Sequence, residues 1–218
     1  MKNTLLLLCL LTSILPLYAQ NVLQDPVTGK VYNSDKYSAV KGSPFLFEEW
    51  MKGSVTTPQG IYKNLELKLD SYNNTVFFKS SDEPYEFQQK VIGFTLMPRP
   101  GDSSTYLVFR NGVSGNGLRP DQFIQILTEG KLSLYRSEIK LVADVNQINQ
   151  GVIKTFTTST RYFAMKDDVL QTMKMNKASI YELIKDKEQQ IDSFVAQNKL
   201  STRKESDLIK IVQYYNTL

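Results

Sequence analysis

The sequence predicts an α+β protein in which an antiparallel β meander, either a sandwich or a partly closed barrel, is followed by C-terminal helices. Two observations support this prediction. The middle of the chain contains many short runs of strand-forming residues separated by turn residues, several with apolar and polar residues in alternation. After Met175 the apolar period lengthens to 3.6 residues and Lys, Glu and Gln become frequent.

We expect four segments: a signal peptide at 1–19, an irregular N-terminal arm at 20–42, a β-rich domain at 43–175, and a helical segment at 176–218 packed on the β domain. Lys2 provides a positive start, an apolar run follows, and the small residue Ala19 precedes the expected cleavage before Gln20. Pro16 interrupts the run before it reaches the roughly 20 apolar residues that a membrane-spanning helix needs. The sequence therefore predicts an exported protein, periplasmic, surface-bound or secreted, with no transmembrane segment after cleavage.

Composition excludes several kinds of active site. The chain has no His, and its single cysteine, Cys9, lies in the expected signal peptide. Ser-His and Cys-His nucleophile pairs and the usual zinc and copper sites are therefore absent. Carboxylate pairs, Ser-Lys dyads and oxygen-ligated calcium remain open, so an enzyme is disfavoured, and we expect no cofactor or metal. The net charge of +4 is too small to indicate nucleic acid as a partner.

The β-rich domain begins after an aromatic cluster of Phe45, Phe47 and Trp50, which we interpret as a plug closing one end of the core. Period-two alternation places Ile61, Leu65, Leu67 and Leu69 on one face of a strand, which a turn at 70–74 joins to its partner. The full set of expected strands is 52–57, 61–69, 75–79, 86–91, 94–97, 105–110, 123–127, 131–135, 161–164 and 169–173.

A helical hairpin is expected at the C-terminus. Its first helix carries Ile180, Leu183 and Ile184 on one face, then Ile191, Phe194 and Val195, and ends at Asn198. Thr202 and Glu205 have the spacing of a capping box for a last helix. That helix has an apolar stripe of Leu208, Ile211, Val212 and Tyr215, which we expect to pack in the core.

Several segments resemble exported proteins of the Bacteroidota that have no assigned activity. They are 42–44 leading to 49–50 and 53–55, then 60–64 with 67–70, the hairpin 126–131, and the tail from 198–201 to 214–216. The resemblance spans nearly all of the mature chain. It implies the envelope of a bacterium with two membranes and provides no catalytic residues.

A glycine-rich loop is the first candidate binding site. Arg110, Gly112, Gly115, Gly117 and Arg119 could bind an anion through backbone N–H groups and two guanidinium groups. The loop lacks the Lys-Ser/Thr ending of a P-loop, and no helix pattern follows it. A plain connection between strands is the favoured interpretation.

Acidic residues form three further candidates, at 82–83 with Glu86, at 48–49 and at 167–168. Carboxylate pairs catalyse hydrolysis when they lie about 5 to 10 Å apart in a cleft, but exposed turns explain all three groups. Asp70 with Asn73 and Asn74 offers oxygen ligands without the spacing of a calcium loop, so we expect a side-chain-capped turn there.

Aromatic residues provide the last candidate, a tapered cavity for a lipid or another apolar molecule. Its expected lining is Phe77, Phe78, Phe87, Phe94 and Phe109. Strand propensity alone explains most of these rings. The favoured function is a non-catalytic binding or assembly module whose partner is an envelope protein; the alternatives are a carrier of an apolar ligand and a carboxylate-dependent enzyme.

Overall fold

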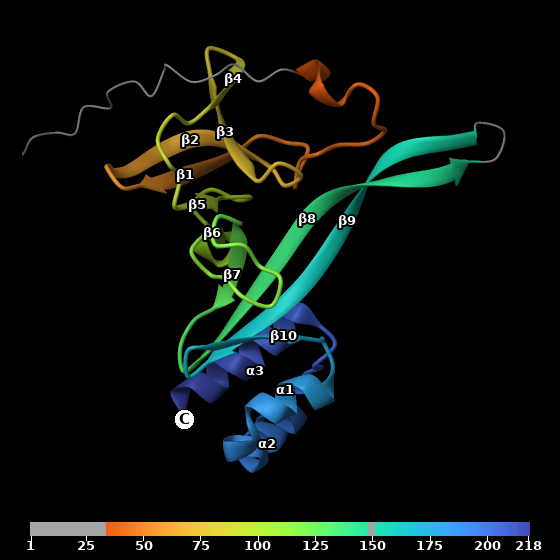
Figure 1. Cartoon of the computed structure of the whole chain (residues 1–218). Coiled ribbons are helices and arrows are strands. Elements are labelled where there is room, and N and C mark those ends of the chain that lie inside the picture. Colours follow the sequence, from red (N-terminus) through yellow and green to blue (C-terminus); the bar gives the residue numbers. More distant parts are fainter. Residues whose placement is uncertain (1–33, 148–150) are drawn as a thin grey trace, which may run out of the picture.

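A computed structural model describes residues 34–147 and 151–218 (Figure 1). Ten antiparallel strands form one sheet in the order β10-β9-β8-β7-β6-β5-β1-β2-β3-β4. The strands are β1 (Met51–Thr57), β2 (Gly60–Asp70), β3 (Thr75–Ser80), β4 (Glu83–Glu86), β5 (Gly93–Leu96), β6 (Leu107–Arg110), β7 (Ile124–Thr128), β8 (Leu132–Gln147), β9 (Gly151–Lys166) and β10 (Val169–Met173). The helices are α1 (Lys177–Leu183), α2 (Glu188–Asn198) and α3 (Glu205–Thr217), with short 3-10 turns η1 (Ser34–Tyr37), η2 (Ser103–Thr105) and η3 (Lys185–Lys187).

The predicted α+β class is confirmed, and the sheet is open, not closed into a barrel. The strand expected at 86–91 is wrong, because β4 ends at Glu86 and the following residues leave the sheet. Phe87 turns inward there and its ring lies 4.7 Å from that of Phe78. Phe87 therefore packs in the core from a loop, although its apolar side chain had suggested a position in a strand.

The alternation in β2 is interrupted by a bulge. Gly53 lies opposite Leu65 and Val55 lies opposite Tyr62, so two residues of β2 face one residue of β1. Asn64, at a φ of 59°, takes up the extra residue. The face expected for Ile61 is therefore wrong: the bulge reverses the alternation, and Ile61 is 61% exposed.

The strands expected at 131–135 and 161–164 are the paired bases of two much longer strands. β8 and β9 each contain 16 residues and pair along their whole length, from Leu132 opposite Lys166 to Gln147 opposite Gly151. Their distal halves extend away from the rest of the molecule (Figure 1). We call residues 138–147 of β8 and 151–160 of β9 the ribbon.

Three apolar clusters form the core. One lies between the helices and the bases of β8 and β9, a second joins β1, β2, β3, β5 and β6, and a small third one lies where the glycine-rich loop meets β7, β8 and β9. The stripe expected on the last helix is confirmed, since Leu208, Ile211, Val212 and Tyr215 are at most 4% exposed in the first cluster. The helices therefore hold the proximal end of β8 and β9, opposite to the ribbon.

The capping box expected for α3 does not form. The helix begins at Glu205 after Lys204, which makes no side-chain capping bond. The Glu205 carboxylate instead accepts hydrogen bonds from Arg136 and from the Tyr162 hydroxyl, at 3.1 and 2.8 Å. The Glu205 side chain therefore cannot cap the helix, because it forms an ion pair with Arg136 of β8.

Candidate functional site

The glycine-rich loop uses its polar groups internally. The backbone N–H of Gly112 donates to the carbonyl of Pro120 at 2.7 Å, and Gly115 and Leu118 exchange hydrogen bonds at 3.2 and 2.9 Å. Val113 and Leu118 are buried, so the loop covers the third apolar cluster. Gly117 lies against Arg161, whose guanidinium donates to its carbonyl at 3.1 Å.

Both guanidinium groups of this loop also have partners. Arg110 forms an ion pair with Glu129 at 2.7 Å and donates to the Tyr135 hydroxyl at 2.8 Å. Arg119 pairs with Asp121 at 3.2 Å, two residues along the chain. The geometry supports the interpretation of the loop as a connection that fixes β6 against β7 and β8, and no anion is needed to balance either arginine.

Two of the three acidic candidates are separated by the strand order, and the third, Glu48 and Glu49, lies near Lys68 of β2. Asp82 lies in the turn between β3 and β4, where the ammonium of Lys79, 2.7 Å away, lowers the pKa of its carboxyl. Asp167 and Asp168 form the turn between β9 and β10, with φ values of 51° and 60°. These turns belong to opposite edges of the sheet. No group of three or more His, Cys, Asp or Glu residues within 34–147 and 151–218 could hold a metal ion.

The segment around Asp70 is the side-chain-capped turn that the sequence predicts. Asp70 is 1% exposed, and its carboxylate accepts from the backbone N–H groups of Tyr72 and Asn73 at 3.0 and 2.9 Å and from the Tyr37 hydroxyl at 2.7 Å. Asn74 instead bridges to the loop before β7, donating to the Asp121 carbonyl and accepting from Phe123 N–H, both at 2.8 Å. The oxygens are therefore used to hold the turn.

Four of the five aromatic candidates share one cluster in which ring contacts ring. Phe94 stacks on Phe109 at 4.6 Å, and Phe78 lies 4.7 Å from Phe87. Phe77 precedes Phe78 in β3 and packs separately on Phe45 at 6.5 Å. All five are at most 9% exposed. The rings therefore have one another as packing partners.

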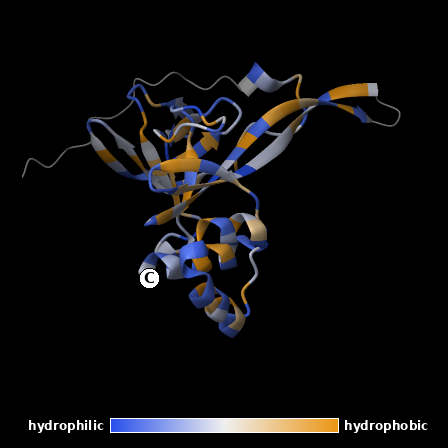
Figure 2. Ribbon diagram, turned by 60° about the horizontal axis from the view of Figure 1, so that its bottom comes forward, coloured by the Kyte–Doolittle hydropathy of each residue, from blue (hydrophilic) through white to orange (hydrophobic). Residues whose placement is uncertain are grey.

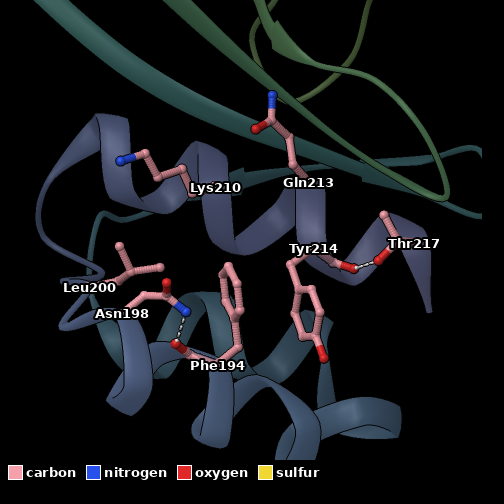
Figure 3. A pocket seen from close by; sticks show the side chains of 7 residues that line it. All are labelled: Phe194, Asn198, Leu200, Lys210, Gln213, Tyr214 and Thr217. Atoms are coloured by element: carbon pink, nitrogen blue, oxygen red, sulfur yellow. Dashed lines mark hydrogen bonds between the residues drawn. The ribbon is translucent and has the colours of Figure 1, made fainter.

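A surface hollow of about 380 Å³ lies between α2 and α3 (Figure 3). The rings of Phe194 and Tyr214 line it and stack on each other at 4.1 Å, and the polar side chains of Asn198, Lys210 and Gln213 also line it. Because the two ring faces cover each other, their contact serves to hold the helices together. The packing stripe predicted to include Phe194 agrees with this contact.

A charged network joins α3 to the sheet beneath the ribbon. Arg136 lies between Glu205, at 3.1 Å, and the Gln125 side-chain oxygen, at 2.6 Å. Burial of the Tyr162 phenol and its hydrogen bond to Glu205 raise the pKa of Tyr162 above its usual value. The hydroxyl therefore stays protonated as a donor, and the network serves as a structural anchor for the last helix.

The ribbon carries apolar side chains beyond the core. Leu141 is 46% exposed and Val152 is 67% exposed, and hydrophobic positions continue along both strands of the ribbon (Figure 2). Leu141, Val145 and Ile153 share one face, since Val145 lies opposite Ile153 and Leu141 is four residues from Val145. Large apolar side chains that extend into solvent on a long hairpin are typical of an interaction surface.

Both edges of the ribbon are largely unpaired within the described residues. β7 pairs with β8 no farther than Arg136, and β10 pairs with β9 no farther than Tyr162. Midway along its length the ribbon receives an aromatic contact, because Phe156 lies 5.5 Å from Tyr37 and 5.3 Å from Tyr72. Lys41 adds one parallel bridge beside Thr155.

Sequence reasoning missed the ribbon. Residues 136–147 continue to alternate, with Ile139, Leu141, Ala143 and Val145 at every second position, but charged residues between them obscured the strand. The Thr-rich run before Arg161 also has high strand propensity. These two signals, together with a short polar loop, were the available evidence for a long hairpin.

Comparison with protein-family models, with curated proteins and with solved structures finds no match for this chain. In the described part of the chain, no helix is long and apolar enough to cross a membrane. The expected cleavage between Ala19 and Gln20 lies outside the described residues.

Proposed function

We propose that this chain is an exported binding or assembly module of a bacterial envelope, without a catalytic role, and that the ribbon is its contact element. The resemblance to exported Bacteroidota proteins supports the setting. The observation that carries the proposal is the ribbon itself: a hairpin of 16-residue strands whose distal half bears exposed apolar side chains and edges that are largely unpaired by the described residues.

Leaving the ribbon uncovered in solvent has a free-energy cost. Unpaired strand edges and exposed apolar side chains invite aggregation, and proteins usually cover or charge them. A binding partner that covers the ribbon removes this cost and gains apolar contact area. The aromatic rings of the second cluster pack on each other, which supports an external contact surface more than an internal ligand cavity.

The test compares the mature protein with a shortened variant in which Ile139 is joined to Ser159 through Asn-Gly. These two residues face each other in register, and the two-residue turn suits an antiparallel pair. The deletion removes residues 140–158 and leaves the bases of both strands, which pack in two of the apolar clusters. Tagged versions of both proteins are purified gently from the native envelope and measured by native mass spectrometry.

We expect intact protein beginning at Gln20, with a bound protein that the shortened variant loses. An unchanged set of bound proteins in the shortened variant contradicts the role of the ribbon. A tightly held small mass in both variants contradicts the proposal and supports the carrier of an apolar ligand.

A further inference from the structure

One stretch of the ribbon edge is open between two segments that already pair there. Lys41 donates its N–H to the carbonyl of Lys154 and accepts from the N–H of Phe156, both at 2.9 Å. At the other end, Met173 of β10 pairs with Tyr162. Between Phe156 and Tyr162, no described segment pairs with the outer edge of β9.

The backbone groups in this gap point outward. Successive residues of a paired strand direct their N–H and C=O groups alternately to one neighbour and to the other. Because those of Lys154 and Phe156 face Lys41, those of Thr158 and Thr160 face the same side. On the β8 edge, Lys140, which lies opposite Thr158, likewise donates its N–H outward, to Ser71.

The gap adjoins a hollow that can take a side chain. A surface hollow of about 380 Å³ is lined by residues 160–162 of β9 and residues 172–175 at the end of β10. Its lining includes Met173 and Met175, whose flexible thioethers adapt to varied apolar side chains. An added strand would thus find backbone partners in the gap and an apolar pocket at its end.

The charges around the gap are mostly positive. Lys140 places its ammonium 3.0 Å from the Thr158 hydroxyl. Arg161 lies within the gap, and Lys154 and Lys174 lie at its two ends. Three carboxylates are also near: Glu138 lies opposite Thr160 and 3.9 Å from Arg136, Asp144 lies opposite Lys154, and Glu205 accepts a hydrogen bond from Tyr162.

We propose that the outer edge of β9 between Phe156 and Tyr162 binds an acidic, extended segment of a partner protein as an additional strand. The inference rests on the proposed function and names the contact that the ribbon makes. A second copy of this chain fits less well, because pairing two such edges would bring Lys154, Arg161 and Lys174 of both copies to one seam.

The test uses the mature protein and a fluorescein-labelled heptapeptide of alternating Glu and Val, followed by fluorescence anisotropy at low salt. Thr158→Pro removes an outward N–H and inserts a ring into the gap without removing a bond to β8. We expect binding to weaken at least tenfold. Asn146→Pro, on the outward edge of β8, is the matched control and should change binding less than twofold.

Charge is tested separately. The double variant Lys154→Glu with Lys174→Glu should weaken binding and flatten its salt dependence, whereas Lys63→Glu in β2 should not. A heptapeptide of alternating Lys and Val should not bind. If Thr158→Pro fails to fold, as judged by circular dichroism, the fully N-methylated acidic peptide replaces it, and we expect no binding of that peptide.

Absence of binding by the acidic peptide, or equal binding by the Thr158→Pro variant, overturns the inference. A dimer in sedimentation experiments that Thr158→Pro abolishes also overturns it and assigns the edge to a second copy. If the shortened variant loses its native partners but the Thr158→Pro variant keeps them, the ribbon is still the contact element. The outer edge of β9 is then rejected as the site of that contact.

Discussion

Asn216 acts as a strand partner although it lies in a helix, and replacing it tests how α3 is held on the sheet. The N–H of Leu132 donates to the Asn216 side-chain oxygen at 2.8 Å, and the side-chain nitrogen donates to the Leu132 carbonyl at 2.9 Å. A longer contact of 3.4 Å reaches the carbonyl of Glu129. Leu132 is fully buried, and in the described structure β7 pairs with β8 no closer to it than Leu134.

Asn216→Ala leaves the buried N–H and C=O of Leu132 without these partners. A buried backbone group that loses its hydrogen bond costs about 1 to 3 kcal/mol. Partial access of water near Asn216, whose side chain is half-buried, lowers that cost. We therefore expect the free energy of unfolding to fall by about 2 to 4 kcal/mol.

Urea unfolding of the mature protein, followed by circular dichroism, measures the change. Asn198→Ala is the matched control, because Asn198 is exposed and its side chain bonds to a carbonyl of its own helix, so its effect should stay near about 0.5 kcal/mol. A Cβ added at Gly130 would lie 2.5 Å from the Asn216 side-chain nitrogen. Gly130→Ala should therefore cost less in the Asn216→Ala background than alone. A loss below about 0.5 kcal/mol for Asn216→Ala refutes the reasoning.

Three further predictions concern stability. Lys166, 2.9 Å from the half-exposed Asp186, lowers the pKa of that carboxyl through a hydrogen bond. The ionised carboxylate of Asp186 therefore stabilises the fold above pH 3.8, and this stabilisation is lost as pH falls. In the Asp186→Asn variant, the free energy of unfolding should fall less on acidification than in the unchanged protein, by an amount below about 1 kcal/mol. An equal fall in both proteins contradicts this. Burial and a hydrogen bond to Asp192 raise the pKa of Tyr181, so stability should decline above pH 10, and less steeply in Tyr181→Phe, as alkaline unfolding curves would reveal. Gly53→Ala places a Cβ 2.3 Å from a backbone oxygen of β5 and should cost about 1 to 3 kcal/mol in urea unfolding, whereas unchanged stability would mean that β1 and β5 separate easily.

The local pattern of apolar residues was enough to predict the fold class and most of the helices and strands. Each of these elements buries one apolar face, and the spacing of its apolar residues reveals that face. The stripe from Leu208 to Tyr215 packs as its period indicates. The prediction failed where a tertiary contact changed the local rule. The bulge at Asn64 reversed the face of Ile61, and the ion pair with Arg136 removed Glu205 from its expected cap.

The candidate site was harder to predict because it consists of backbone groups of β9 that no described strand pairs with. Thr158 and Thr160 carry no distinctive chemistry, and their outward N–H and C=O groups matter because β10 ends its pairing at Tyr162. Strand register and the length of a neighbouring strand are non-local properties. By contrast, the glycines from Gly112 to Gly117 stood out in the sequence but serve a structural loop.

The way β8 and β9 are anchored bears on how well the ribbon can bind. Their bases pass through two apolar clusters, with Leu134 and Ala164 in one and Tyr135 and Phe163 in the other. Phe156 then fixes the ribbon farther out. A strand edge held in this way is already ordered before a partner arrives, so binding carries a smaller entropic cost than it would on a flexible loop. The same anchoring means that shortening the ribbon from its distal end should leave the clusters intact, so a lost partner would report on the contact and not on the fold.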